Sequence, residues 1–142
     1  MKIKDIMSLN VVAVDEHTSF DDAKTIMKAH KIRRLPVLRR NKLVGLVTER
    51  RLLETGPSPA TSLSVHELNY LLEKMTVKEI MVKHPTTISP DMAVMDAVEL
   101  GEKMGYGCFP VVEGGRLVGI VTECDIVKLT THILAYEERA AA

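Results

Sequence analysis

A block of about fifty residues occurs twice in this chain, and the two copies are shifted by 74 positions. The run LVGLVTE at 43–49 returns as LVGIVTE at 117–123, and the Pro-Val pair at 36–37 returns at 110–111. One offset aligns the apolar, turn and charged positions without a gap, so each copy is one structural unit. Two such units usually bury their open faces against each other. We therefore expect one shared core about a pseudo-twofold axis.

The repeat divides the chain into four parts. We expect a first repeat over residues 1–56, a linker with a helix over 57–75, a second repeat over 76–135 and a C-terminal tail over 136–142. Gly56 and the prolines at 57 and 59 break the chain before the linker helix. Ser64 and Glu67 have the spacing of a capping box, which predicts that this helix begins at residue 65.

Each repeat predicts the order strand, helix, strand, strand, helix, so the fold class is α/β (α+β). In the first repeat we expect strands at 11–14, 35–38 and 43–47, with a helix that follows Ser19 as its N-cap. A strand at 86–88 and a hairpin turn at Gly114 correspond to them in the second repeat. Thr48 and Thr122 are expected to cap the last helix of each repeat. The helix after Thr122 carries more apolar residues than its partner, and a second subunit is their simplest cover.

Charge and composition limit the classes of function. Lys plus Arg and Asp plus Glu both number 19, so no net positive field favours nucleic acid as a partner. No apolar run approaches twenty residues, so we expect no membrane-spanning segment. The N-terminal residues lack the apolar stretch of a secretory signal, and Cys108 and Cys124 show no pairing pattern. These features favour a reduced, cytoplasmic compartment.

The sequence shows no pattern that favours catalysis or metal binding. The five histidines share no metal-ligand spacing, so we expect no metal site. Cys124 has no general base nearby in the sequence. There is no paired-carboxylate, P-loop or dinucleotide-binding glycine pattern. An enzyme is therefore the least favoured class, and we expect no catalytic residues.

The repeats resemble the cystathionine β-synthase (CBS) domain pair. The motifs that carry the resemblance are D-I-M at 5–7, R-L-P-V at 34–37 and L-V-G-hydrophobic-V-T at 43–48 and 117–122. The stretch 58–72 is similar to the connecting segment of acetoin-utilisation-type bacterial CBS proteins. The resemblance implies a regulatory module that binds AMP, ADP, ATP or S-adenosylmethionine between its repeats. It also implies pairing into homodimers and no catalytic activity of the module itself.

The ligand motif of this family, Gly-hydrophobic-x-Ser/Thr-x-x-Asp, is intact in the second copy. It runs from Gly119 to Asp125, with Thr122 at the expected start of a helix. The Thr122 hydroxyl can meet a phosphate or ribose oxygen there, because the free amides of a helix N-terminus favour anions. Ionised Asp125 can accept hydrogen bonds from both ribose hydroxyls. The alternative is that Thr122 is only an N-cap and Asp125 only an acid of the first helical turn.

The first copy carries Arg51 at the position that Asp125 has in the second copy. A guanidinium has five donors and no acceptor, so it cannot hold a ribose diol in that way. The resemblance implies that Arg33 and Arg34 lie opposite Asp125, where they would bind phosphates. The alternative for these two arginines is a merely solvated charge pair. We therefore expect one nucleotide site per chain.

The resemblance also implies that Val12 and Ile120 line the adenine base and that Ser8 approaches it. The expected ligand-binding residues are thus Thr122, Asp125, Arg33, Arg34, Ile120, Val12 and Ser8. The leading hypothesis is a homodimeric module that senses an adenine nucleotide (AMP, ADP or ATP) and signals to a target protein, with no required cofactor. The alternatives are a ligand-free dimerisation scaffold and a sensor of S-adenosylmethionine or NAD.

Overall fold

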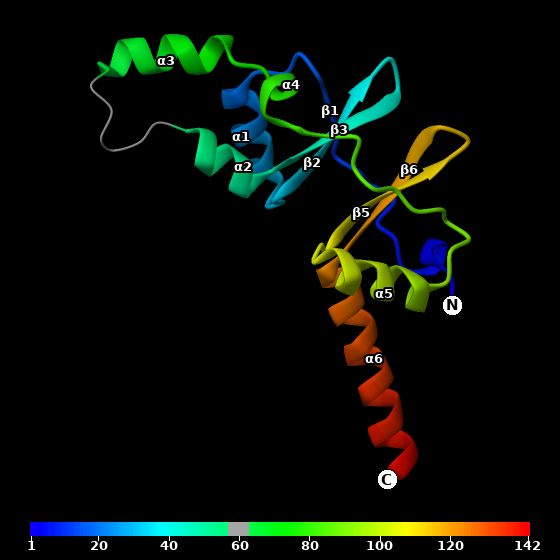
Figure 1. Cartoon of the computed structure of the whole chain (residues 1–142). Helices are drawn as coiled ribbons and strands as arrows, with labels where there is room; N and C mark the ends of the chain where they lie inside the picture. The colour runs from blue at the N-terminus through cyan, green and yellow to red at the C-terminus, as the bar shows by residue number, and fades with distance from the viewer. Residues whose placement is uncertain (57–62) are drawn as a thin grey trace. The chain divides into compact units, whose positions relative to one another are not determined.

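The computed structural model describes residues 1–56 and 63–142 (Figure 1). Residues 57–62, the first part of the predicted linker, lie outside the described residues. The chain separates into two compact units. Unit 1 contains residues 1–11 and 86–142, and unit 2 contains the described residues between 12 and 85. Each unit therefore takes residues from both sequence repeats.

Unit 2 is built around a four-stranded sheet with the strand order β1-β2-β3-β4. The strands are β1 (Val14–Asp15), β2 (Arg34–Arg39), β3 (Lys42–Thr48) and β4 (Val82–Lys83). β1 and β2 are parallel, whereas β3 is antiparallel to both of its neighbours. The strand predicted at 11–14 is therefore displaced, because only Val14 and Asp15 pair with β2.

The helices described in unit 2 are α1 (Phe20–His30), α2 (Glu49–Thr55), α3 (Val65–Lys74) and α4 (Val77–Ile80). Three of them, α1, α2 and α3, begin where the sequence predicts, whereas the short helix α4 was not predicted. Ser19, Thr48 and Ser64 each accept a hydrogen bond from the backbone amide three residues later, at 3.1, 3.1 and 3.2 Å. Glu67 completes the capping box by accepting from the Ser64 amide at 3.2 Å. These bonds satisfy amides that have no partner inside the helix, so the predicted caps are confirmed.

Unit 1 contains the second hairpin and the longest helix of the described chain. Its elements are the 3-10 turn η1 (Ile3–Asp5), α5 (Val94–Met104), β5 (Cys108–Glu113), β6 (Arg116–Thr122) and α6 (Glu123–Ala141). Gly114 and Gly115 form the predicted turn, with φ of 57° and 79°. The predicted strand at 86–88 is wrong, because Ile88 makes only an isolated parallel bridge to Val111. α6 has 19 residues against 7 in α2 and continues through the predicted tail to Ala141.

The segment before each repeat packs on the other repeat, and its backbone hydrogen bonds obey the same 74-residue offset. Ile3 N–H donates to the Met92 carbonyl at 2.9 Å, and its counterpart Val77 N–H donates to the Thr18 carbonyl at 2.9 Å. Three further matched pairs of backbone contacts follow the offset. The Val94 and Phe20 amides donate to the Met1 and Met75 carbonyls, and the Lys4 and Lys78 amides donate to the Pro90 and Glu16 carbonyls. Isolated bridges join Lys2 to Ala93 and Ser19 to Thr76. This repeated pattern explains why the compact units divide the chain at residues 11 and 85.

Both exchanged segments supply residues to the hydrophobic cores. Ile3 is fully buried in the core of unit 1, which also contains Phe109 and Val111. Val77 is fully buried in the core of unit 2, beside Leu35 and other apolar residues of its sheet and helices. Burial of an aliphatic side chain stabilises by roughly 1.5–3 kcal/mol relative to exposure. The exchanged segments are therefore part of the packed structure and not surface extensions.

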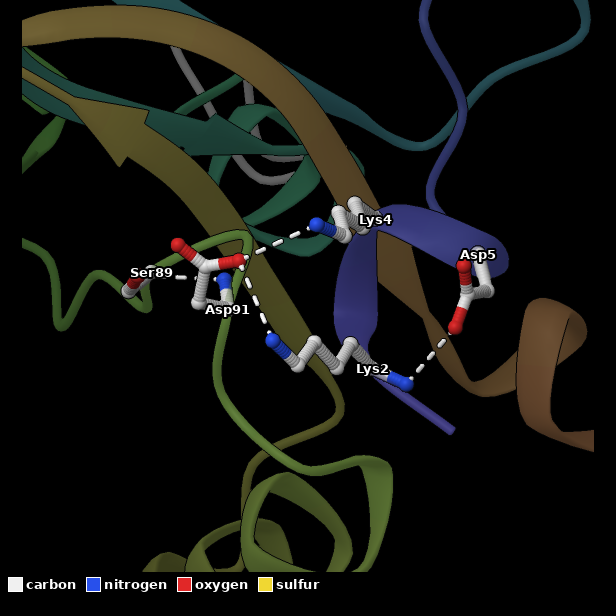
Figure 2. A network of polar contacts seen from close by, with 5 residues as sticks. All are labelled: Lys2, Lys4, Asp5, Ser89 and Asp91. Atoms are coloured by element: carbon white, nitrogen blue, oxygen red, sulfur yellow. Dashed lines mark hydrogen bonds and ion pairs between the residues drawn. The ribbon is translucent and has the colours of Figure 1, made fainter.

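Charged side chains add to the docking of the N-terminal segment in unit 1 (Figure 2). Asp91 Oδ1 lies 3.3 Å from Lys4 Nζ and 3.7 Å from Lys2 Nζ. The Lys2 backbone amide is held by Asp5, and the Asp91 amide by Ser89. The hydrogen bond and charge of Lys4, with the charge of Lys2, hold the pKa of Asp91 below its ordinary value. The carboxylate is solvent-exposed, so these contacts orient the segment more than they stabilise it.

The described helices include none that is both long and apolar enough to cross a lipid bilayer.

Candidate functional site

The two copies of the ligand motif have the same backbone setting. In each copy a strand ends at the threonine and a helix begins at the next residue: β6 and α6 meet at Thr122, and β3 and α2 meet at Thr48. The other strand of each hairpin pairs Cys108 with Thr122 and Arg34 with Thr48. Both threonines are half-buried. Each motif therefore places a hydroxyl at a helix start, where the first helical amide already donates to a backbone carbonyl, that of Gly107 for α6 and that of Arg33 for α2.

Asp125 lies in the first turn of α6 and is half-buried. Its Oδ2 accepts hydrogen bonds from the Thr122 backbone N–H at 2.8 Å and from the Thr122 hydroxyl at 3.4 Å. These contacts orient the carboxylate at the helix N-terminus. No residue in the described part of the chain bonds to Oδ1. Asp125 can therefore cap α6 through one oxygen and still accept from a ligand hydroxyl through the other.

Arg51, the counterpart of Asp125, makes a contact inside unit 2. Its backbone amide donates to Thr48 Oγ1, so the cap survives in the first copy. Its Nε donates to the carbonyl oxygen of Ile80 at 3.0 Å. Ile80 is the last residue of α4, and carbonyl groups at a helix end lack partners inside the helix. Arg51 therefore connects α2 to α4 and offers no acceptor to a ribose.

Ser8 and Ile120 are joined directly in unit 1. Their backbones exchange two hydrogen bonds, Ser8 N–H to Ile120 O at 3.0 Å and Ile120 N–H to Ser8 O at 3.1 Å. Gly119 makes this close approach possible, because a Cβ at that position would lie 2.7 Å from Met7 Sδ and 3.1 Å from the Ser8 carbonyl oxygen. The motif glycine thus has a packing role: it admits the N-terminal segment beside β6.

The predicted ligand residues divide between the two units. Those in unit 1 are Ser8, Ile120, Thr122 and Asp125. The other three belong to unit 2, where Val12 packs against the core and Arg34 is half-buried at the start of β2. Arg33 is exposed, and its backbone carbonyl accepts from the first amide of α2 at 2.7 Å. In unit 1 the junction of β6 with α6 and the backbone pairing of Ser8 with Ile120 bring its four predicted residues together.

Two features of the structure had no counterpart in the sequence predictions. The acceptor of Arg51 is a backbone carbonyl, and carbonyl groups carry no sequence signature. Glu16 is the one buried charged residue among the described residues, with 4% exposure. The only feature of the sequence that sets Glu16 apart is that the equivalent position of the second repeat, 74 residues later, is Pro90.

Neither metal ligands nor paired cysteines add to this site. Residues 1–56 and 63–142 contain no group of three His, Cys, Asp or Glu side chains that could hold a metal ion. Among the described residues Cys108 is buried and Cys124 is exposed, and neither forms a disulfide.

The model of the family described as "CBS domain" matches residues 3–57 and 77–131. These two matches cover more than half of the chain and coincide with the two sequence repeats. The chain therefore belongs to the CBS-domain family, as its motifs predicted. CBS domain pairs are generally regulatory modules.

Curated relatives include short and long proteins. A CBS domain-containing protein of Dictyostelium discoideum, DDB_G0289609, is 31% identical over 134 residues, which are 93% of this chain and 92% of that protein. The A-adding tRNA nucleotidyltransferase of Aquifex aeolicus is 33% identical over 129 residues, 90% of this chain. An inosine-5'-monophosphate dehydrogenase of Korarchaeum cryptofilum is 31% identical over 129 residues, 89% of this chain. The chain spans only 14% and 24% of the lengths of these two enzymes.

Solved structures share the fold over almost the whole chain. The acetoin utilization protein AcuB of Vibrio cholerae is 28% identical, with a TM-score of 0.80 and coverage of 98% of this chain and 96% of AcuB. CBSX2 in complex with AMP is 29% identical, with a TM-score of 0.76 and coverage of 93% and 97%. The CBS domain pair of MJ0100, in complex with 5'-methylthioadenosine and S-adenosyl-L-methionine, is 28% identical, with a TM-score of 0.75 and the same coverage. Similar chains thus bind adenosine-containing ligands.

Proposed function

We propose that this chain is a regulatory module that binds an adenine nucleotide (AMP, ADP or ATP) and communicates the bound state to a partner protein. The observation that carries the proposal is the difference between Asp125 and Arg51. Asp125 is held by Thr122 and keeps an oxygen available for a ribose hydroxyl, whereas Arg51 donates to the chain's own backbone. The complexes of CBSX2 with AMP and of MJ0100 with adenosine derivatives support the ligand class.

In this proposal the ribose binds Asp125 and Thr122 at the start of α6. Each charge-assisted hydrogen bond to the carboxylate contributes about 1.5–3 kcal/mol. Ile120 and Ser8 adjoin this position through their paired backbones and are proposed to contact the base, together with Val12. Arg33 and Arg34 are proposed to bind the phosphates, and this assignment rests on the family resemblance.

Calorimetric titration of three variants with AMP, ADP and ATP tests these roles. Asp125→Asn keeps an acceptor for the Thr122 amide but removes the negative charge. It is therefore expected to weaken the binding of all three nucleotides by about tenfold. Arg33→Ala is expected to weaken ATP more than AMP, and the difference is expected to fade as salt screens the added phosphate charges. Arg51→Ala is the matched control for Asp125, since it changes the equivalent position of the other copy.

The pattern of responses decides between assignments. Unchanged affinity in Asp125→Asn with lost affinity in Arg51→Ala would assign the nucleotide to the first motif copy and overturn the proposal. Equal effects of Arg33→Ala on AMP and ATP would remove Arg33 from the phosphate contacts. If no variant changes binding, the motif acts only as a helix cap.

We also propose that the chain forms a homodimer through its exposed helices. None of the residues of α6 is buried. Val127, Ile133, Leu134 and Tyr136 are 64%, 49%, 53% and 74% exposed, and such apolar surface is characteristic of interaction sites. Sedimentation velocity at micromolar concentration should show a dimer, and Leu134→Asp should shift it to a monomer. A monomeric parent chain would contradict this part of the proposal.

S-adenosylmethionine is a second candidate ligand, because the MJ0100 pair binds it together with 5'-methylthioadenosine. It shares the ribose diol that Asp125 is proposed to hold but has no phosphate for Arg33 or Arg34. Titration of the Arg33→Ala variant with S-adenosylmethionine separates the two ligands: its affinity is expected to be unchanged, while that of ATP falls. Tighter binding of S-adenosylmethionine than of any nucleotide by the parent chain would favour this candidate.

A further inference from the structure

Unit 2 contains a cleft of about 750 Å³ at the turn between β2 and β3. Its polar lining comes from two acids, Asp15 and Glu16, together with His17, Arg39, Arg40 and Lys42, and Leu43 and Val44 add an aliphatic wall. All of these residues belong to unit 2 and none belongs to the ligand motif. The volume lies in the range of small-molecule sites, roughly 300–1,000 Å³.

Glu16 is the unusual member of this lining, because it is a largely buried carboxylate whose ion-pair contacts are long. Only 6% of its side chain is exposed, and its Oε1 lies 3.6 Å from His17 Nε2 and 3.9 Å from Arg39 Nε. Both distances exceed those of a hydrogen bond, which are about 2.7–3.2 Å. Among the described residues, the Glu16 carboxylate has no closer polar partner. In the described parts of the chain no fully buried polar side-chain atom lacks a hydrogen-bond partner, so the Glu16 carboxylate keeps contact with the solvent of the cleft and can accept hydrogen bonds there.

The position of Glu16 is fixed by its backbone. Its N–H donates to the Leu38 carbonyl of β2, and its carbonyl accepts from Lys78, both at 3.1 Å. These bonds hold the Glu16 backbone between two parts of unit 2, so the residue stays at the edge of the cleft.

The cationic rim of the cleft is held in a strained backbone. Arg40 and Asn41 have φ of 50° and 65°, a region that favours glycine, and the second repeat has Gly114 and Gly115 at these positions. Arg40 thus occupies a turn position where glycine would fit without strain. Such positions are more common at functional sites than elsewhere.

The second repeat differs at most positions of the cleft, which provides an internal comparison. In place of Glu16, His17, Arg39 and Arg40 it has Pro90, Asp91, Glu113 and Gly114. The combination of one buried acid with several cations is therefore specific to the first repeat. It is not a requirement of the shared fold.

We propose that this cleft binds a phosphorylated sugar or polyol. The hydroxyl groups of such a ligand donate to Glu16, and its phosphate is bound by Arg40 and Lys42. A simple anion is disfavoured, because Glu16 repels it. A neutral sugar is disfavoured as well, because Arg40 and Lys42 would stay without an anionic partner. This site is separate from the proposed nucleotide site, and its occupancy is independent of Asp125.

The test uses ribose 5-phosphate as the probe and the Asp125→Asn chain as the background, so that the proposed nucleotide site contributes less and the position of the NMR shifts separates the two sites. Amide shifts in two-dimensional NMR spectra should change in a saturable manner at residues 15–17 and 39–44. Inorganic phosphate and unphosphorylated ribose should each bind at least about fivefold more weakly, since each lacks one of the two interactions.

Variants then assign the interactions. Arg40→Gly installs the residue of the second repeat and relieves strain, so the fold is retained, and it should weaken ribose 5-phosphate by about fivefold or more. Glu16→Gln should weaken ribose 5-phosphate but tighten inorganic phosphate, because it removes the repelling charge. Lys42→Ala should weaken binding of ribose 5-phosphate, whereas Arg116→Ala, at the equivalent position of the second repeat, should have no effect on it.

The proposal is overturned if ribose 5-phosphate causes no saturable shifts at millimolar concentration. It is also overturned if inorganic phosphate binds as well as the probe to the background chain, or if Arg40→Gly and Glu16→Gln leave probe binding unchanged. When Arg40→Gly or Glu16→Gln is introduced into the parent chain, which keeps Asp125, AMP should bind as it does to the parent. Failure of this proposal therefore does not bear on the proposed nucleotide site.

Discussion

Replacement of Ile3 by alanine tests whether the N-terminal segment belongs to the fold of unit 1. Ile3 is fully buried in the core that residues 86–142 form, and its amide donates to the Met92 carbonyl. Ile→Ala substitutions in cores cost about 2–5 kcal/mol, because apolar contacts are lost and a cavity is left. We therefore expect Ile3→Ala to lower the free energy of unfolding in urea by about 3 kcal/mol.

Hydrogen exchange measured by mass spectrometry shows where this stability is lost. Local openings follow the cooperative units of a structure, so Ile3→Ala should accelerate exchange in β5, β6 and α5. These elements are more than eighty residues away from Ile3 along the chain. Elements of the same sequence repeat, such as α1 and β2, should be much less affected.

Two further variants control this experiment. Val77→Ala is the counterpart by the 74-residue offset. It is expected to cost roughly 1.6 kcal/mol or more for two lost methyl groups and to accelerate exchange in α1 and β2. Leu9→Ala changes a side chain that is 70% exposed and should stay within about 0.5 kcal/mol of the parent. The reasoning fails if Ile3→Ala accelerates exchange in the first repeat and spares residues 86–142.

Two other predictions concern polar contacts. Arg51→Ala removes the hydrogen bond to the Ile80 carbonyl. In urea titrations the variant should have a free energy of unfolding about 1 kcal/mol below that of the parent. An unchanged free energy of unfolding would show that this bond contributes nothing. The hydrogen bond and charge of Lys4 hold the pKa of Asp91 below its ordinary value, so the pair contributes stability above the unfolded-state pKa and loses it as the pH falls through the folded-state pKa. Lys4→Ala should therefore be slightly less stable than the parent at neutral pH, and urea titrations should show this difference shrinking below about pH 4; a difference that persists in acid would contradict the assignment.

The local features of the fold were predictable from the sequence because they depend on neighbouring residues. The helix starts at Ser19, Thr48 and Ser64 follow from side chains that bond amides three residues away. The hairpin at Gly114 follows from its need for positive φ. The strand at 86–88 was predicted wrongly because β propensity does not provide a pairing partner, and only Ile88 reaches β5.

Long-range contacts were less accessible to sequence reasoning. The repeat showed which positions are equivalent. It did not show that Ile3, from the first repeat, packs in the core of unit 1, or that Val77, from the second repeat, packs in the core of unit 2. For the site, the motif identified Asp125 and Thr122, and the structure adds the hydrogen bonds that orient the carboxylate. The partner of Arg51 and the burial of Glu16 could not be anticipated, because each depends on backbone brought in from a distant part of the chain.

The central claim is that this chain binds one adenine nucleotide through the motif copy that contains Asp125. Isothermal titration of the parent chain with AMP, followed by the same titration of Asp125→Asn, tests it most directly. The account predicts a stoichiometry of one AMP per chain and an affinity that falls by about tenfold in the variant. Two equal sites per chain, or no heat of binding for AMP, ADP and ATP alike, would contradict it.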